Sequence, residues 1–221
     1  MPEMRTIARI RTPFKTKFGI PRQSGVAPQV RGEIVFEPEY RSVDAVRGMQ
    51  GYSHLWLLWL FSESPTDKWS PTVRPPRLGG NVRMGVFATR SPFRPNPIGL
   101  SSVELEKIEY TADRGPVLIV RGADLMDGTP ILDIKPYIAY ADSHPDATGG
   151  FTDTAEFKKL CVLLPDGMTL PEGLREVLEN DPRPRYQNDP DRVYGMLYDG
   201  YEVKFRVADD TLTVISMEKS N

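Results

Sequence analysis

The sequence predicts a mainly β protein with a small α+β module at its C-terminal end. Three observations favour this fold class: stretches with helical periodicity are scarce, short apolar runs are separated by Gly, Pro and Asp turns, and prolines are frequent. Of the 21 prolines, seven lie between Pro65 and Pro97. Because proline fixes the backbone and has no amide donor, that region must be extended or turned. The 221 residues suffice for one large domain, or for a large and a small one.

Seven stretches in the first part of the chain have the character of short strands. They are Thr6–Ile10, Glu33–Phe36, His54–Phe61, Met84–Ala88, Leu100–Ile108, Val117–Arg121 and Ile131–Ile138. Val103–Glu106 alternates strictly between apolar and polar residues, although the longer stretch around it does not. Short strands joined by turns predict a barrel or a sandwich. Between two of them, Arg41–Met49 predicts a single short helix.

The stretch His54–Phe61 is apolar at nearly every position, which is typical of a strand buried on both faces. We therefore expect core positions at Trp56, Leu57, Trp59 and Phe61. His54, at the head of the strand, is expected to have a structural role.

The pattern changes near residue 165. Leu170–Asn180 predicts a short helix with Pro171 in its first turn. Three strands follow, at Val193–Tyr198, Tyr201–Val207 and Leu212–Met217, and Asp199-Gly200 is a strong hairpin signal between the first two. We therefore predict two domains, residues 1–162 and residues 163–221. The second is a helix packed on a three-stranded antiparallel meander.

The net charge of −2 conceals two basic segments. Residues 1–35 carry seven Lys and Arg against two acids, and residues 68–103 carry six Lys and Arg and no acid. If the two segments lie side by side in the fold, they form a cationic face suited to phosphates. The alternative is that these arginines pair with acids elsewhere in the chain.

Several protein classes are excluded or disfavoured by the sequence. The longest apolar run, Leu55–Phe61, has seven residues, whereas a membrane-spanning helix needs about 20. The N-terminus lacks the pattern of a signal peptide, so we expect a cytoplasmic protein. One cysteine and two histidines exclude an intrachain disulfide and the usual zinc sites, and Cys161 is expected to pack as a small hydrophobic residue. Dinucleotide, phosphate-loop and nucleophile-elbow signatures are absent from the sequence.

The strongest candidate for a binding site is the segment Val86–Leu105, VFATRSPFRPNPIGLSSVEL. Arg90, Arg94 and Asn96 supply hydrogen-bond donors, and Phe93 supplies a stacking face. Three prolines stiffen the segment, so a ligand could bind without first ordering the chain. This combination suits a nucleoside. The alternative is a proline-stiffened connection with solvated arginines.

The segment Val86–Leu105 resembles the signature of the TrmO-type tRNA methyltransferase family. Further blocks are similar to that family and follow in its order: Pro21–Val26 (PRQSGV), Tyr52–Trp56 (YSHLW), Thr72–Gly85 (TVRPPRLGGNVRMG), Asp124–Tyr137 (DLMDGTPILDIKPY) and Asp181–Gln187 (DPRPRYQ). The likeness covers nearly the whole chain, and Gly149–Leu160 is a stretch that does not align. It implies a single-sheeted β-barrel that binds S-adenosylmethionine and works as a homodimer. The implied reaction is methylation of the N6 nitrogen of N6-threonylcarbamoyladenosine, next to the anticodon of threonine tRNA.

The resemblance also implies roles for individual residues. The cofactor pocket would be formed by Ser24, Gly25, Val26, Arg90, Ser91, Pro92, Asn96, Leu100, Ser102, Leu125, Asp127, Gly128, Thr129 and Pro130. Without the resemblance, Asp127-Gly128 would predict a simple hairpin turn. The basic residues expected to contact tRNA are Arg74, Arg77, Arg83 and Arg94, with Lys15, Lys17 and Arg22. Lys135 would hold a phosphate or the substrate carboxylate.

Methyl transfer to a carbamoylated nitrogen benefits from a base, because the lone pair of that nitrogen is delocalised and its proton must leave. Asp133 and Tyr137 are the candidate catalytic residues. Strand alternation puts Asp133, Lys135 and Tyr137 on one face, from which they would converge on one cavity. The alternative is that Asp133 and Lys135 form a surface ion pair of little energetic weight.

The sequence is therefore compatible with two functions from different classes. The first is an RNA methyltransferase that uses S-adenosylmethionine. The second is a non-catalytic β-barrel that binds RNA or a nucleoside. The enzyme is favoured, because the cofactor blocks, the segment around Asp133 and the basic segments occur together, whereas a binding module would need only the basic segments.

Overall fold

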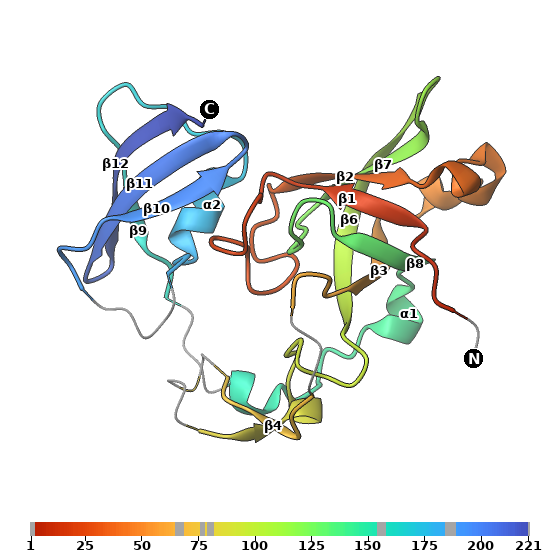
Figure 1. Ribbon diagram of the computed structural model, residues 1–221, viewed down its shortest axis with the longest axis horizontal. Coiled ribbons are helices and arrows are strands. Elements are labelled where there is room, and N and C mark those ends of the chain that lie inside the picture. Colours follow the sequence, from red (N-terminus) through yellow and green to blue (C-terminus); the bar gives the residue numbers. More distant parts are fainter. Residues whose placement is uncertain are drawn as a thin grey trace.

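The computed structural model describes residues 3–64, 69–75, 78, 82–153, 158–183 and 189–220. Within these ranges, strands close into an antiparallel barrel in the order β1-β2-β7-β6-β3-β8 (Figure 1). The barrel strands are β1 (Ala8–Arg11), β2 (Arg31–Phe36), β3 (His54–Leu60), β6 (Ile98–Thr111), β7 (Gly115–Arg121) and β8 (Pro130–Pro136). The predicted mainly β fold class is confirmed, and of barrel and sandwich the barrel is correct.

Alternate residues of the strands fill the barrel interior. In β3, Leu55, Leu57 and Trp59 point inward and are buried, as the two-residue period of a strand requires. Trp56 points outward and is half-buried, so its prediction as a core residue is wrong. Phe61 lies just past the end of the strand and packs against the core while remaining half-buried.

A β-bulge explains why β6 does not alternate along its whole length. Its register against β7 shifts between Leu105 and Lys107, which leaves Glu106 as the extra residue. An extra residue reverses the side to which the following side chains point. Odd-numbered residues face inward before the bulge, and Ile108 packs against the core after it. Leu100 lies on the outer face and is 53% exposed.

The predicted helix Arg41–Met49 is wrong. This region consists of short 3₁₀ turns: η1 (Pro38–Tyr40), η2 (Val43–Val46) and η3 (Met49–Gly51). Gly48, between η2 and η3, has a φ of 83°, which is a left-handed conformation that cannot continue a helix.

The predicted strand Met84–Ala88 is longer than the one observed. The observed strand β5 (Met84–Gly85) pairs with β4 (Thr72–Val73), and the 3₁₀ turn η5 (Val86–Ala88) follows directly. Two short elements lie beyond the barrel, α1 (Ala139–Asp142) and η6 (Gly150–Thr152).

The C-terminal part is a sheet with one short helix packed against it. Its elements are β9 (Cys161–Leu163), α2 (Leu174–Glu179), β10 (Tyr194–Tyr198), β11 (Tyr201–Ala208) and β12 (Thr211–Lys219). The three predicted strands form the meander β10-β11-β12, with the predicted hairpin turn at Asp199 and Gly200, whose φ values are 48° and 75°. The helix α2 is shorter than predicted, because Gly173 before it is left-handed, with a φ of 78°.

A fourth strand, β9, pairs in parallel with β12 and was not indicated by the sequence. It lies at the edge of the sheet and is too short to show an alternating pattern. Cys161 is exposed on this edge, so the prediction that it packs as a small hydrophobic residue is wrong.

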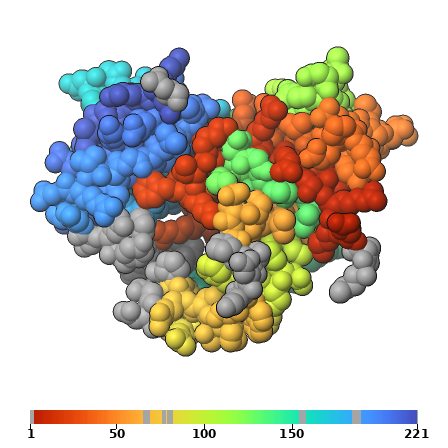
Figure 2. All heavy atoms as spheres, viewed as in Figure 1, coloured from red at the N-terminus to blue at the C-terminus, as the bar shows by residue number. Residues whose placement is uncertain are grey.

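A second apolar core joins the two parts of the molecule. Phe14, Ala27 and Val30, from the connection between β1 and β2, are buried among side chains of α2 and the C-terminal sheet. This connection, coloured red, lies between the blue C-terminal sheet and the barrel (Figures 1 and 2). The ring of Phe14 meets that of Tyr198 edge to face, with 5.5 Å between centroids. The division between residues 162 and 163 stays a prediction, and β9 spans it.

Candidate functional site

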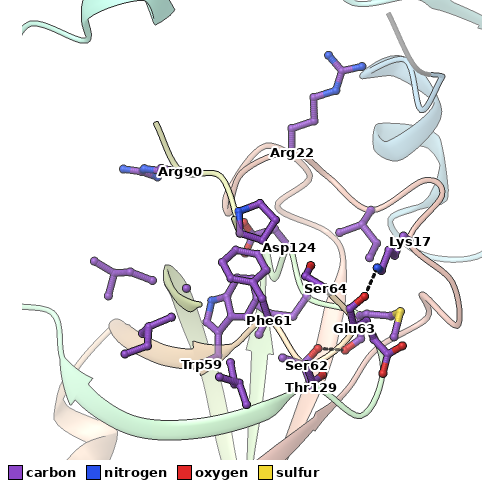
Figure 3. Close-up of a pocket in the computed structure, with 18 of the residues that line it drawn as sticks. Lys17, Arg22, Trp59, Phe61, Ser62, Glu63, Ser64, Arg90, Asp124 and Thr129 are labelled. Atoms are coloured by element: carbon purple, nitrogen blue, oxygen red, sulfur yellow. Dashed lines mark hydrogen bonds between the residues drawn. The ribbon is translucent and has the colours of Figure 1, made fainter. Parts of the chain in front are cut away.

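A cavity of about 550 Å³ opens where β3 ends. Its walls come from segments far apart in the sequence: the connection between β1 and β2, the residues after β3, the loop before β6 and the turn before β8. Figure 3 shows the side chains around it, which include cations (Lys17, Arg22), a carboxylate (Asp124) and aromatic rings (Trp59, Phe61). Its volume is within the range of roughly 300–1,000 Å³ that is typical of small-molecule sites.

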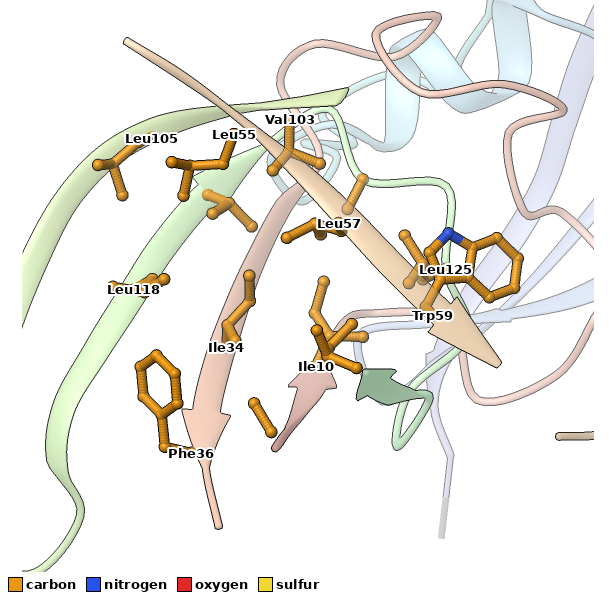
Figure 4. Close-up of a cluster of buried hydrophobic side chains, with 14 of the residues drawn as sticks. Ile10, Ile34, Phe36, Leu55, Leu57, Trp59, Val103, Leu105, Leu118 and Leu125 are labelled. Atoms are coloured by element: carbon orange, nitrogen blue, oxygen red, sulfur yellow. The ribbon is translucent and has the colours of Figure 1, made fainter. Parts of the chain in front are cut away.

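A chain of hydrogen bonds runs from the barrel core to the cavity wall. Trp59 Nε1 donates to Ser101 Oγ at 3.0 Å, and Ser101 Oγ donates to Asp124 Oδ1 at 2.6 Å. The register of β3 against β6 pairs Trp59 with Gly99, which leaves room for the indole because it has no side chain. Figure 4 shows Trp59 at one end of the buried cluster of the barrel. The strand pairing therefore creates the chain of contacts.

Asp124 is half-buried in the wall of the cavity. Burial raises the pKa of its carboxyl above the ordinary range, although the hydrogen bond from Ser101 and the charge of Arg90 oppose this shift. A carboxyl whose pKa is raised by desolvation in a cleft is a candidate for a functional group.

The loop before β6 is fixed by one of its own arginines. Arg94 Nη1 donates to the backbone carbonyl of Thr89 at 2.8 Å, and more weakly to those of Val86 and Ser91 at 3.4 Å. Within the same loop, Arg90 Nη1 donates to the side-chain oxygen of Gln23. The loop is thus braced internally and tied to the opposite wall of the cavity.

A second cavity has a volume of about 780 Å³ and adjoins the first. The two cavities share part of their walls, including Gln23, Thr89, Arg90 and Pro92. Within the described part of its lining, the second cavity has no acidic residue. It has the cationic residues Lys17, Arg22, Arg74, Arg90 and Arg183. Phe93 adds an aromatic ring that is 45% exposed.

The structure brings part of the predicted cofactor set to these cavities. The first cavity is lined by the predicted residues Arg90, Pro92, Leu100, Leu125 and Thr129, and the second also by Ser91. Neither cavity is lined by Ser24, Gly25, Val26, Asn96, Ser102, Asp127, Gly128 or Pro130.

Asp127 is engaged by the segment that follows β1. Its Oδ1 accepts from the backbone N–H of Thr12 at 3.0 Å, and its Oδ2 pairs with Lys15 at 2.6 Å. Gly128 follows with a φ of 80°. The dipeptide thus forms a turn, but not the hairpin turn that its sequence alone predicts, because β7 and β8 on either side of it are not paired with each other. Lys15 is paired within the fold.

Asp133, Lys135 and Tyr137 lie on the outer face of the barrel and not in the cavity. Asp133 and Lys135 form an ion pair at 2.9 Å, with side chains 45% and 63% exposed. The ring of Tyr137 packs on Trp56, with 5.5 Å between centroids. The predicted convergence on one cavity is therefore not found, and the alternative of a surface pair is correct. The catalytic roles of Asp133 and Tyr137 stay predictions.

The remaining basic residues divide into two groups. Arg74, Lys17 and Arg22 line the second cavity, and Arg83 is exposed. Arg77 lies outside the described residues. Others pair with acids on the barrel, as the alternative predicted: Arg9 with Glu37, and Arg31 with Glu106. Part of the basic set therefore lies at the cavities, and part is paired with acids on the barrel.

Several residues of the site were missed by sequence reasoning. They are Gln23, Trp59, Phe61 and Asp124, whereas Ser101 lies within the stretch Leu100–Ser102 that was expected at the cofactor pocket. Trp59 and Phe61 looked like ordinary core residues, and Ser101 and Asp124 come together only through strand pairing. One signal was available in the sequence: Asp124 lies between the apolar residues Ala123 and Leu125, shortly after the apolar strand β7, and an acid in such a position is unusual unless it has a partner.

Two classes of feature are not found among the described residues. No group of three or more His, Cys, Asp or Glu side chains could hold a metal ion. No helix in the described ranges is long and apolar enough to span a membrane.

Comparison with known proteins identifies relatives over nearly the whole chain. Residues 9–143 match the family described as tRNA-methyltransferase O N-terminal domain, and residues 153–220 match the TrmO C-terminal domain. The tRNA (adenine(37)-N6)-methyltransferase of Escherichia coli is 42% identical, with 96% of each chain covered. A putative S-adenosylmethionine-dependent methyltransferase RcsF of Pseudomonas aeruginosa is 44% identical, with 86% of each covered.

The fold agrees with these matches. The crystal structure of TrmO from P. aeruginosa superposes with a TM-score of 0.80 at 34% identity, and covers 100% of this chain and 98% of that one. The resemblance found in the sequence is thereby confirmed, as are the predictions of an enzyme and of S-adenosylmethionine as its cofactor. The chain belongs to the tRNA-methyltransferase O family.

Proposed function

We propose that this chain methylates the N6 nitrogen of N6-threonylcarbamoyladenosine at position 37 of tRNA, with threonine tRNA as substrate. The observation that carries the proposal is the shared wall between the two cavities. One cavity has the mixed charge and aromatic rings that a methyl-donor nucleoside requires, and the other is cationic and aromatic. Donor and acceptor must approach to roughly 3–3.5 Å for transfer, so adjacent sites are what the reaction needs.

The first cavity fits S-adenosylmethionine by the chemistry of its lining. Arg90, Arg22 and Lys17 suit the carboxylate of the amino-acid tail. Trp59 and Phe61, whose rings lie with 4.2 Å between centroids, offer apolar surface to the adenine. When bound, the cofactor supplies an electrophilic methyl group on a sulfonium. The chain has to hold it, exclude water and receive the proton that the acceptor nitrogen loses.

The second cavity suits the RNA substrate. A threonylcarbamoyl group ends in a carboxylate, and RNA brings phosphates, both of which arginines bind well. Bases in RNA loops are bound by splaying them out and stacking them on aromatic rings, and Phe93 is exposed at this cavity. We assign RNA contacts to Arg74, Arg83 and Lys135. Arg77 and Arg94 belong to the same predicted set.

We further propose that the chain works as a homodimer through the outer face of β3 and β6. The support is the apolar character of that face, where Leu100 is 53% exposed beside the half-buried Leu58 and Leu60. Leu60 and Leu100 also line the first cavity, so this face borders the cofactor site. A Leu58→Glu variant is expected to sediment as a monomer where the wild type sediments as a dimer. A second subunit would also be the means by which Asp133 and Tyr137 could approach a cavity. The domain division near residue 162 and the cytoplasmic location are part of the same proposal.

The test is nucleoside mass spectrometry of tRNA from cells with and without the gene, followed by reaction of the purified protein. We expect loss of the methylated threonylcarbamoyladenosine and accumulation of its precursor. In vitro, the protein should methylate threonine tRNA that carries threonylcarbamoyladenosine and leave the unmodified transcript unchanged. Methylation of the unmodified transcript would contradict the assigned acceptor, and an unchanged nucleoside profile would contradict the reaction.

A further inference from the structure

We propose that Asp124 is the base that accepts the proton of the acceptor nitrogen, and that Ser101 and Trp59 position it. The proposal rests on the proposed function, since it assigns a role within that reaction. It differs from the expectation that Asp133 or Tyr137 is the base. It follows from the hydrogen-bond chain and from the comparison of the acids near the cavity.

The chemistry of the groups fixes the direction of the two hydrogen bonds that link Trp59, Ser101 and Asp124. An indole nitrogen can only donate, so Ser101 Oγ must accept from Trp59. The single hydroxyl proton of Ser101 is then free to point to Asp124 Oδ1, at 2.6 Å. Asp124 Oδ1 is therefore held as an acceptor. A proton taken up by this carboxyl resides on Oδ2, and the hydrogen bond from Ser101 survives.

This arrangement gives Asp124 a property that a base requires. Its orientation is the same before and after it takes up a proton, because the oxygen that holds it in place is not the one that is protonated. Burial of the carboxyl raises its pKa, which makes it a stronger base. The charged groups that line the cavity with it are Arg90 and Arg94 of the loop before β6, Lys17 and Arg22 of the connection between β1 and β2, and Glu63 after β3.

The other carboxylates near the site are less suited to the role. Asp127 has both oxygens engaged, by Thr12 and Lys15. Asp133 pairs with Lys135 on the outer face of the barrel. Glu63 also lines the cavity, but it is exposed, since it lies beyond the end of β3. Among these, only Asp124 both lines the cavity and is half-buried, and it is held by an uncharged donor.

Atoms and charges balance in the proposed methyl transfer from sulfur to the acceptor nitrogen. A bond forms between the acceptor nitrogen and the methyl carbon while the bond between that carbon and sulfur breaks. The electron pair of the broken bond stays on sulfur, which becomes an uncharged thioether. The proton of the nitrogen passes to Asp124 Oδ2 and later to solvent. No oxidant, reductant or further reactant is needed.

The first test compares Asp124→Asn with the wild type in single-turnover methylation of tRNA that carries threonylcarbamoyladenosine, with cofactor affinity measured by calorimetry. Removal of a general base is expected to lower the rate by about 10²–10⁴-fold. The affinity for S-adenosylmethionine should change only a few-fold, because Asn still accepts from Ser101. Ser101→Ala should give a smaller loss of rate, as expected for a positioning residue. Asp44→Asn, an exposed carboxylate of η2, serves as the control.

The second test measures stability and needs no cofactor. A carboxyl whose pKa is raised in the folded chain stabilises the fold below its unfolded pKa of about 3.9, and this contribution is lost as pH rises through the folded value. Asparagine does not titrate, so Asp124→Asn does not lose this contribution. The difference between the urea midpoints of the variant and the wild type should therefore grow in favour of the variant as pH rises from 4 to 7. A stability difference between Asp124→Asn and the wild type that is the same at every pH would show that the folded chain does not raise the pKa of this carboxyl, which would remove one support for its role as the base. Asp44→Asn should follow the wild type.

The outcomes separate the two proposals. An inactive wild type overturns both the proposed function and the base. An active wild type with an unimpaired Asp124→Asn overturns the base alone, as does a variant that loses cofactor affinity in proportion to its rate. If Asp133→Asn loses more of the methylation rate than Asp124→Asn, the base would be Asp133 on the outer face of the barrel, and the proposal for Asp124 would be wrong.

Discussion

Gly99 lies where any side chain would overlap the indole ring of Trp59. Replacement by alanine must move the ring, because the nearest atoms belong to a rigid aromatic group in a packed core. The displaced indole would no longer donate to Ser101. We expect Gly99→Ala to lower the free energy of unfolding by about 1–3 kcal/mol, as overpacked cores do, and to weaken cofactor binding.

The measurements for this variant are urea unfolding and calorimetric titration with S-adenosylmethionine. Gly51→Ala is the matched control, since an added Cβ at Gly51 meets nothing within 4 Å and its φ is not positive. Equal stability of the two variants would show that the indole is not held by the close approach of Gly99.

At the scale of one loop, Arg94 is mainly a structural residue, because its guanidinium group donates to backbone carbonyls of its own loop. It binds carbonyl oxygens at both ends of the turn that presents Arg90 and Pro92. A lysine keeps the charge but cannot reach several carbonyls at once. We expect Arg94→Lys to weaken cofactor affinity by about 1.5–3 kcal/mol, the range for hydrogen bonds to charged groups.

Titration calorimetry of Arg94→Lys measures this loss directly. Arg47→Lys, an exposed arginine of the turn before η3, is the control. If Arg94 serves only to contact tRNA phosphates, the lysine variant would bind the cofactor normally and lose affinity only for RNA.

The bulge of β6 directs Glu106 toward two arginines, Arg31 of β2 and Arg121 of β7. The hydrogen bond from Arg31 lowers the pKa of Glu106 below the ordinary glutamate range. A lowered carboxyl pKa stabilises the fold above the unfolded pKa, about 4.3, and this contribution is lost as pH falls through the folded value. The free energy of unfolding of the wild type should therefore decrease as pH falls below about 5. That of Glu106→Gln should decrease less steeply.

Urea unfolding at a series of pH values from 3 to 7 checks this expectation. Glu3→Gln, an exposed acid of the N-terminal segment, controls for the general effect of charge. Parallel profiles for wild type and Glu106→Gln would show that the carboxylate at the bulge does not contribute.

Most strands could be predicted because their pattern is local, whereas the site could not. Val117–Arg121 and the hairpin at Asp199-Gly200 are visible in a few consecutive residues. The bulge at Glu106 was visible only as a failure of alternation, and β9 was too short to see. Asp124 and Ser101 meet because of the register of β3, β6 and the turn before β8, which no local pattern encodes. Five of the predicted cofactor residues nevertheless line the first cavity, all within the blocks that carry the resemblance.

At the scale of the whole molecule, the second apolar core contains side chains from both the β1–β2 connection and the C-terminal part. The barrel and the C-terminal part should therefore unfold together. Phe14 comes from the barrel side, is fully buried and packs edge to face on Tyr198 of β10. Phe14→Ala should lower the free energy of unfolding by about 3–5 kcal/mol, as buried phenylalanines generally do. Intrinsic fluorescence and far-ultraviolet dichroism should still give coincident transitions. Two separated transitions in the wild type would contradict a shared core.

The connection between β1 and β2 has a consequence for ligand binding. One side of this segment, with Phe14, Ala27 and Val30, lies in the C-terminal core, and another, with Lys17 and Arg22, lies against the cavities. Whatever orders this segment from one side lowers the entropy that remains to be lost on the other. Occupancy of the cavity should therefore slow hydrogen exchange in β10 and β11. By thermodynamic reciprocity, substitutions that loosen α2 should weaken affinity at a cavity they never touch.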